Sequence, residues 1–155
     1  MQYIGSMASE IRDINLAESG ERKIEWVKRN CNLLRTLEQE FSETKPFAGK
    51  KIALSVHLEA KPAFLCQVLA AGGAEMYITG SNPLSTQDPV CAALAEDGVH
   101  VFSRRGMSAE EYDENLGLAL DWNPDIIIDD GGDLVAMLAE KRRELIPAIL
   151  GGCEE

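Results

Sequence analysis

From Lys51 onward, short apolar stretches alternate with longer stretches of helical periodicity, and this alternation limits the possible folds more than any other feature. Five stretches have the length and composition of strands, and single helical stretches separate them. Strands joined by one helix each run parallel, with right-handed crossovers and helices on both faces of the sheet. The sequence therefore predicts an α/β fold: a three-layer α/β/α domain with a mostly parallel five-stranded sheet, flavodoxin-like or Rossmann-like, preceded by two helices.

The expected boundaries follow from periodicity and from capping residues. Strands are expected over 52–56, 75–79, 99–102, 125–128 and 148–150, and helices over 13–29, 32–44, 63–71, 86–96, 108–120 and 134–145. Asp13 is the expected cap of the first helix, and either Ser85 or Thr86 caps the helix at 86–96. Ser108 and Glu111 have the spacing of a capping box.

The stretch 125–133, DIIIDDGGD, combines a fully apolar strand with three carboxylates and two glycines. Open α/β sheets bind ligands beyond the carboxyl ends of their strands, and the glycines permit a ligand to approach bare backbone there. A structural interpretation is also open, in which Asp133 caps the next helix while Asp129 and Asp130 are solvated loop acids. We favour the cap for Asp133 and a functional role for Asp130, because capping does not explain a second acid on a tight glycine turn.

Composition narrows the function. The 155 residues suffice for one domain, and 45% hydrophobic with 26% charged residues is typical of a globular protein. A net charge of −11 argues against nucleic acid and against anionic membrane surfaces as partners, and we expect no membrane span. Four isolated cysteines without metal spacing indicate a reduced, cytoplasmic protein with no metal site. Residues 5–7, Gly-Ser-Met, resemble a cloning remnant before an initiator methionine, so we expect residues 1–6 to be such a remnant and the domain to span 7–155.

In a parallel sheet the segments that follow the strands gather on one edge. Here these segments are 57–61, 80–88, 104–107, 129–133 and 154–155, and they hold most candidate reactive residues. His57 could hold or transfer a proton, or merely form a hydrogen bond at a strand end. Asn82 precedes a proline and equally fits a turn, whereas His100, in mid-strand, is expected to be structural. No glycine-rich dinucleotide or phosphate motif is present.

Several motifs follow one another in a characteristic order: DINLAESGERKIEW, HLEAKPAFL, TGSNPLSTQDPVCAAL, EEY, IIIDDGGDL and the closing CEE. Together they resemble the N-terminal part of the substrate-binding domain of adenosylhomocysteinase (S-adenosylhomocysteine hydrolase), over about Asp13 to Glu155. The resemblance implies a cytoplasmic hydrolase of the methyl cycle that uses tightly bound NAD to cleave S-adenosyl-L-homocysteine reversibly into the nucleoside and L-homocysteine. Its partner is a small nucleoside thioether, and the complete protein is expected to be a homo-oligomer.

The same resemblance implies roles for individual residues. Asp130 matches the catalytic aspartate that removes the 4′-proton of the ribose, Glu155 the glutamate that holds the ribose, and His57 the histidine near the 5′ leaving group. Asn82 and Ser85 match the loop near the homocysteine end. No cofactor-binding residues are expected within this chain.

One departure from the family pattern concerns the purine. Where many members have threonine and then glutamate or glutamine after the histidine, this chain has Glu59 and Lys61. The second of these positions normally accepts a hydrogen bond from the adenine amino group, whereas lysine only donates. A donor suits a 6-oxo purine, so the hypothesis is that the substrate is S-inosyl-L-homocysteine.

A second departure is that the family's NAD-binding domain and its further catalytic residues have no counterpart in these 155 residues. We therefore expect a truncated substrate domain, with no detectable hydrolysis by this chain alone when NAD is added. Two alternatives remain open: a stand-alone nucleoside-binding or regulatory module without catalysis, and a domain that self-associates over an exposed apolar edge.

Overall fold

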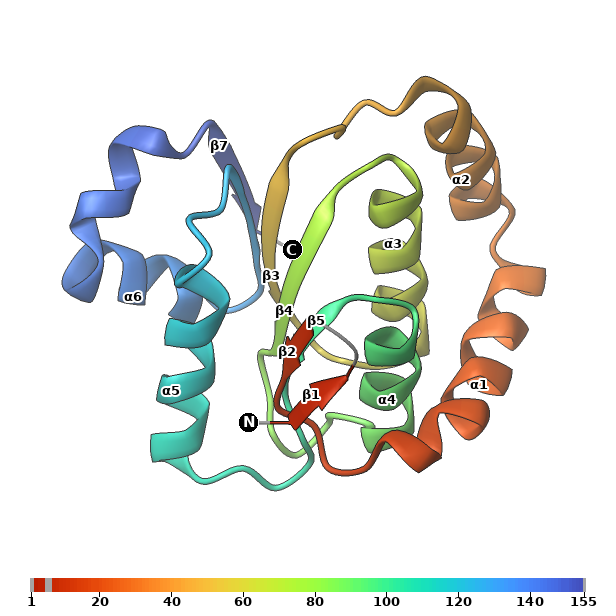
Figure 1. The fold of residues 1–155 in the computed structure, drawn as a ribbon, viewed down its shortest axis with the longest axis horizontal. Helices are drawn as coiled ribbons and strands as arrows, with labels where there is room; N and C mark the ends of the chain where they lie inside the picture. Colours follow the sequence, from red (N-terminus) through yellow and green to blue (C-terminus); the bar gives the residue numbers. More distant parts are fainter. Residues whose placement is uncertain (1, 5–6, 155) are drawn as a thin grey trace.

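The computed structural model describes residues 2–4 and 7–154, and it confirms the predicted parallel sheet (Figure 1). The strands are β3 (Lys51–Val56), β4 (Glu75–Gly80), β5 (His100–Phe102), β6 (Ile126–Asp129) and β7 (Gly151–Glu154). They lie in the order β5-β4-β3-β6-β7, and every neighbouring pair is parallel. With the first strand in the middle and the chain running outward in both directions, this order is of the Rossmann type.

Helices cover both faces of the sheet, as expected for α/β. On one face lie α3 (Ala60–Ala71) and α4 (Asp88–Glu96), and on the other α5 (Ala109–Leu120) and α6 (Asp133–Lys141) (Figure 1). The alternation of side chains along β3 divides the core accordingly: Ile52 and Leu54 pack with α3 and α4, whereas Ala53 packs with α5 and α6. The predicted capping box of Ser108 and Glu111 starts α5.

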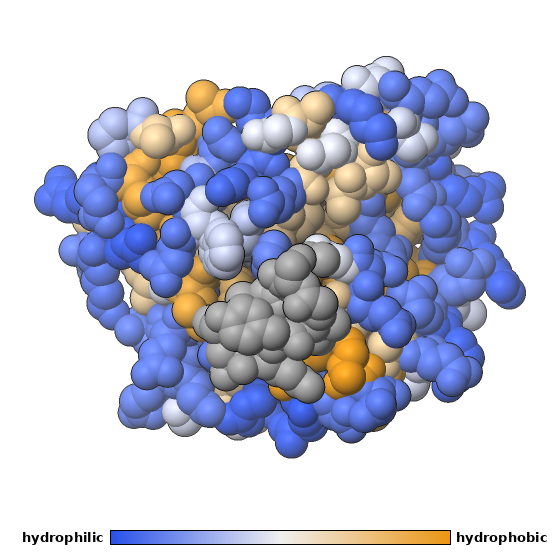
Figure 2. Space-filling view, viewed as in Figure 1, coloured by the Kyte–Doolittle hydropathy of each residue, from blue (hydrophilic) through white to orange (hydrophobic). Residues whose placement is uncertain are grey.

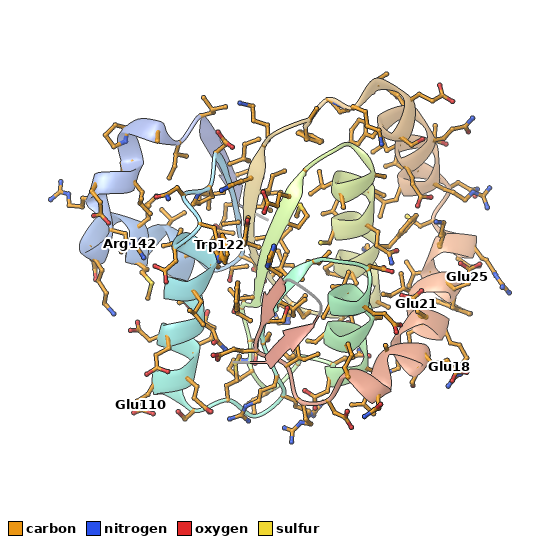
Figure 3. The ribbon with its side chains drawn as sticks, viewed as in Figure 1. Glu18, Glu21, Glu25, Glu110, Trp122 and Arg142 are labelled. Atoms are coloured by element: carbon orange, nitrogen blue, oxygen red, sulfur yellow. The ribbon has the colours of Figure 1, made fainter. Side chains whose placement is uncertain are left out.

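The two N-terminal helices form an additional layer outside α3 and α4. Asp13 accepts a hydrogen bond from the Asn15 N–H and caps the short 3-10 helix η1 (Ile14–Leu16), which continues into α1 (Ala17–Asn30). After a break at Cys31, α2 (Asn32–Thr44) packs on α3, while α1 packs on α4 and α3. Glu18, Glu21 and Glu25 lie along α1 at the right of Figure 3.

The helix-cap prediction for Ser85 or Thr86 is wrong, because α4 begins later. Its N-cap is Gln87, and Pro89 stands in its first turn. The Thr86 hydroxyl instead contacts the Asn82 carbonyl oxygen at 3.1 Å, so it stabilises the preceding loop rather than the helix.

The predicted strand at 148–150 is also wrong. The 3-10 helix η2 (Arg143–Ala148) occupies the first part of this segment, and β7 begins only at Gly151. Glycine has a low strand propensity, and β7 begins with two glycines. The prediction therefore placed the strand in the apolar residues that precede them. In the fold, β7 passes so close to β6 that a Cβ atom on Gly152 would lie 3.2 Å from the Ile127 carbonyl oxygen.

The N-terminal segment forms a small antiparallel hairpin of β1 (Gln2–Ile4) and β2 (Met7–Ser9). The expected start of the domain at residue 7 coincides with the first residue of β2, and the origin of residues 1–6 stays a prediction. Directly after the hairpin, Glu10 forms a parallel bridge to Phe102 of β5, which ties this segment to the edge of the main sheet.

The visible surface agrees with the acidic composition. Figure 2 shows a predominantly hydrophilic face, with hydrophobic residues reaching the surface at the upper left, over the segment that follows α6. Ile146 and Leu150 of this segment are exposed. Within residues 2–4 and 7–154, every helix is too short or too polar to cross a lipid bilayer.

The four cysteines should differ sharply in reactivity toward a thiol reagent at about pH 8. Burial, with a smaller contribution from the charge of Asp97, raises the pKa of the Cys66 thiol to about 12, and burial raises the pKa of Cys91 as well. Both are fully buried, whereas Cys153 is exposed. Because the thiolate is the reactive form, we expect fast reaction of Cys153, slower reaction of half-buried Cys31, and reaction of all four thiols after unfolding in guanidinium.

Ellman's reagent measures this directly. Cys153→Ser should abolish the fast phase, and Cys66→Ser should leave it unchanged. A fast phase that survives the Cys153→Ser substitution would contradict the assignment.

Candidate functional site

The candidate site lies where the strand order changes direction. From β3 the chain moves first toward β4 and later, through α5, to β6 on the other side. The segments after β3 and β6 therefore leave neighbouring strands in opposite directions, and open α/β sheets usually bind their ligands at such a point. His57 follows β3 and Asp130 follows β6, and the His57 Nε2 lies 3.5 Å from the Asp130 Oδ2. The predicted convergence of these two residues is confirmed.

Asp130 is held by a residue that the sequence analysis did not select. The Ser81 hydroxyl donates a hydrogen bond of 3.0 Å to the Asp130 Oδ2. Ser81 follows β4, and its N–H donates to the Val56 carbonyl oxygen at the end of β3. The parallel register, which pairs Val56 with Gly80, thus brings Ser81 beside His57 and toward β6. Asp130 is partly buried, with 27% of its side chain exposed.

On its other side, His57 contacts the loop after β4. Its Nδ1 lies 2.7 Å from the Ser85 Oγ. Asn82 shapes this loop: its side-chain Oδ1 accepts the Leu84 N–H at 2.8 Å, and its carbonyl oxygen accepts the N–H groups of Ser85 and Thr86. The turn interpretation of Asn82 is therefore confirmed, and its substrate-binding role stays a prediction. The same turn places the Ser85 hydroxyl in contact with the His57 ring.

In the acidic turn after β6 (residues 129–133), the capping residue of the next helix is not the one predicted. Gly132 is the N-cap of α6 and Asp133 is its first residue, so the capping role for Asp133 is wrong. Asp129 takes that role instead: its carboxylate accepts the N–H of Val135 at 2.8 Å. Asp129 is fully buried, and burial raises the pKa of its carboxyl. It is therefore not the solvated acid of the structural interpretation.

Two glycines supply the backbone conformation that this turn requires. Gly131 and Gly132 both have positive φ, at 90° and 80°. The Gly131 N–H donates a hydrogen bond of 2.6 Å to the Glu154 carboxylate at the end of β7. Glu154 thereby joins β7 to the acidic turn, a contact that sequence reasoning missed. Glu155, the predicted ribose-holding residue, lies outside the described residues.

A cavity of about 410 Å³ lies against the carboxyl-terminal parts of β3 and β6, where Val56 and Ile128 line it. Its walls are mostly apolar, from Leu34 of α2, Leu65 of α3 and the ends of the two central strands, and Lys61 and Glu154 also line it. Glu154 links the cavity to the acidic turn through Gly131. Apolar walls with a few polar groups suit a planar organic ring.

Glu59 and His100, two further residues considered in the sequence analysis, take no part in the described side-chain contacts of the His57–Asp130 pair. Glu59 is the exposed N-cap residue of α3, and no described contact joins its carboxylate to the His57–Asp130 pair. His100 is buried, with its ring stacked 4.6 Å from that of Tyr77 and 5.2 Å from that of Trp122. Trp122 lies beyond the end of α5 opposite Glu110 (Figure 3), so this aromatic cluster is remote from the site and fits a structural role for His100. Within the part of the chain that the structure describes, no group of three or more His, Cys, Asp or Glu side chains is placed to hold a metal ion.

Comparison with known proteins shows the family of the chain. Residues 8–150 match the family described as S-adenosyl-L-homocysteine hydrolase, and the chain belongs to this hydrolase family. It is 55% identical over 146 residues to the S-inosyl-L-homocysteine hydrolase of Methanocaldococcus jannaschii, covering 94% of this chain and 35% of the relative. It is 52% identical over 145 residues to the adenosylhomocysteinase of Thermococcus kodakarensis, covering 94% and 34%. The chain thus spans about a third of the length of these curated relatives.

Proposed function

We propose that this chain is the substrate-binding part of an enzyme that hydrolyses a purine ribonucleoside thioether of homocysteine. The observation that carries the proposal is the convergence of His57 and Asp130 after β3 and β6, two strands that also contribute Val56 and Ile128 to an apolar cavity. A base that removes a proton from the sugar and a group that serves the leaving sulfur must both stand within reach of one nucleoside. Membership in the hydrolase family supports the reaction class.

In this proposal Asp130 takes a proton from the bound sugar. The Ser81 hydroxyl and the His57 imidazole both approach its Oδ2, so they orient the carboxylate. A carboxylate in a fixed orientation can act as a general base toward a bound sugar. His57, with 47% of its side chain exposed, is open to the leaving group, and Glu155 is proposed to hold the ribose.

NAD is part of the proposed reaction, but the residues described here do not fit it. A dinucleotide-binding sheet carries a glycine-rich turn after its first strand, where backbone N–H groups meet the pyrophosphate. After β3 this chain has His57, Leu58 and Glu59, with Leu58 fully buried. We therefore assign no NAD-binding residue to this chain, and a cofactor would have to be held by residues outside it.

We further propose that the base is hypoxanthine rather than adenine. Lys61 lines the cavity, and its ammonium group only donates hydrogen bonds, which matches the 6-oxo group of hypoxanthine and not the 6-amino group of adenine. The names of the relatives are compatible with both bases, since one is an S-inosyl-L-homocysteine hydrolase and another an adenosylhomocysteinase. The cavity itself supports the choice.

The test compares turnover of the inosyl and adenosyl thioethers by the complete polypeptide that contains these 155 residues. We expect the inosyl thioether to be preferred, and Lys61→Glu to shift the ratio of kcat/KM toward the adenosyl thioether by roughly 10- to 100-fold, the value of one charged hydrogen bond. Lys61→Met is the matched control: it should lower the inosyl preference without improving adenosyl turnover.

The outcomes separate the competing readings. A strong adenosyl preference in the unchanged protein would overturn the choice of base while leaving the reaction class intact. Nucleoside binding, measured by calorimetry, without turnover of either thioether would instead favour a binding module without catalysis.

A further inference from the structure

A residue of the loop after β4 contacts the His57 ring and influences which ring nitrogen carries the proton. The inference drawn from this contact rests on the proposed function. We propose that Ser85 is a positioning residue: its hydroxyl donates to the His57 Nδ1 and so holds the neutral imidazole as the Nε2–H tautomer, with that proton facing Asp130. The ring would then orient the carboxylate before any substrate arrives.

The first step of the argument concerns the single proton of the Ser85 hydroxyl. Two acceptors are within reach, the His57 Nδ1 at 2.7 Å and the Asn82 carbonyl oxygen at 3.2 Å. The Asn82 carbonyl already accepts the N–H groups of Ser85 and Thr86, both at 3.2 Å, and the Thr86 hydroxyl at 3.1 Å. A carbonyl oxygen has two lone pairs, so it gains little from a fourth donor. The proton therefore belongs on the shorter contact, to the His57 Nδ1.

The second step concerns the other ring nitrogen. With Nδ1 as an acceptor, a neutral imidazole carries its proton on Nε2, which lies 3.5 Å from the Asp130 Oδ2. The opposite tautomer would aim the Nε2 lone pair at an ionised carboxylate, which is electrostatically unfavourable. Both contacts of the ring thus favour the same tautomer. Because about half of the side chain is exposed, little else is available to fix the ring.

This arrangement has a chemical consequence. Asp130 receives one donor from Ser81 and one from His57, both on Oδ2, so the orientation of the carboxylate is fixed. His57 starts the reaction with its Nε2 already protonated. It is therefore a donor to the departing sulfur rather than an acceptor from the sugar, which leaves proton removal to Asp130.

Nitrogen-15 NMR of the imidazole rings tests the inference on the chain itself, without substrate or cofactor. The sequence has only two histidines, and buried His100 serves as an internal reference. At about pH 8.5, above the ordinary histidine pKa of about 6.5, we expect the two-bond correlation pattern of His57 to be that of the Nε2–H tautomer, with a hydrogen-bonded Nδ1. In Ser85→Ala the Nδ1 resonance should move toward that of a freely exchanging tautomer mixture.

Two variants keep the test specific. Ser85→Thr retains the hydroxyl and should retain the wild-type pattern, whereas Ser81→Ala removes a donor to Asp130 only and should leave the Nδ1 resonance in place. A wild-type His57 in the Nδ1–H tautomer, or an unchanged spectrum in Ser85→Ala, would overturn the inference. Because the spectrum is recorded without a nucleoside, the tautomer result stands or falls separately from hydrolysis.

Discussion

Replacing Asp130 with asparagine should lower kcat for the nucleoside thioether by about 10²- to 10⁴-fold, the usual contribution of a general base. The amide keeps the size of the side chain but cannot take up a proton. Its oxygen can still accept from Ser81 and His57, which both approach the same carboxylate oxygen, so the loss would report the missing base. The measurement is steady-state kinetics of the complete polypeptide that contains this sequence, with nucleoside binding followed in parallel.

Asp133→Asn is the matched control, because it makes the same chemical change at the first residue of α6, directly after the two glycines. The Asp133 carboxylate accepts the Tyr112 hydroxyl at 2.9 Å, and no described contact joins it to His57. We expect kcat to change only severalfold. Equal losses in the two variants would indicate damage to the turn rather than loss of a base, and an active Asp130→Asn enzyme would refute the assigned role.

Replacing Gly20 with alanine should lower the free energy of unfolding by about 1–3 kcal/mol, the typical cost of overpacking a core. Alanine normally stabilises a helix by up to about 1 kcal/mol relative to glycine. At Gly20, however, a Cβ atom would lie 1.9 Å from the Pro89 carbonyl oxygen and 2.9 Å from the Ala93 Cβ. Pro89 and Ala93 belong to α4, against which α1 packs directly (Figure 1), so the two helices must separate.

Gly117→Ala in α5 provides the control, because the neighbour nearest to its new Cβ atom would be the Met137 sulfur at 3.9 Å, an ordinary contact. Here the helix propensity should dominate and stabilise the chain by up to about 1 kcal/mol. Thermal unfolding at one pH distinguishes the Gly20→Ala and Gly117→Ala variants, since 1 kcal/mol corresponds to a shift of roughly 2–4 °C in Tm for a chain of this size. A Gly20→Ala chain as stable as Gly117→Ala would show that α1 does not pack closely on α4.

Much of the fold followed from local pattern. The alternation of apolar and helical segments predicted the parallel sheet, and α2 begins and ends at the expected residues. Because the carboxyl ends of parallel strands must share an edge, the joint position of His57 and Asp130 also followed without knowledge of side-chain geometry. The failures were at segment ends, where backbone N–H groups have several possible partners. At α6, for example, buried Asp129 reaches past two glycines to the Val135 N–H that Asp133 was expected to serve.

Taken alone, the amino-acid sequence determined the layered α/β architecture, the edge that carries the site and the family resemblance, because hydrophobic periodicity and motif order are local properties. Only the tertiary structure decided which residues contact the acidic turn at Asp130 and Gly131. Ser81 reaches Asp130 because of the register between β3 and β4, and Glu154 reaches Gly131 because β7 lies beside β6. Strand order and register depend on packing between segments far apart in the chain, and no short stretch of sequence records them.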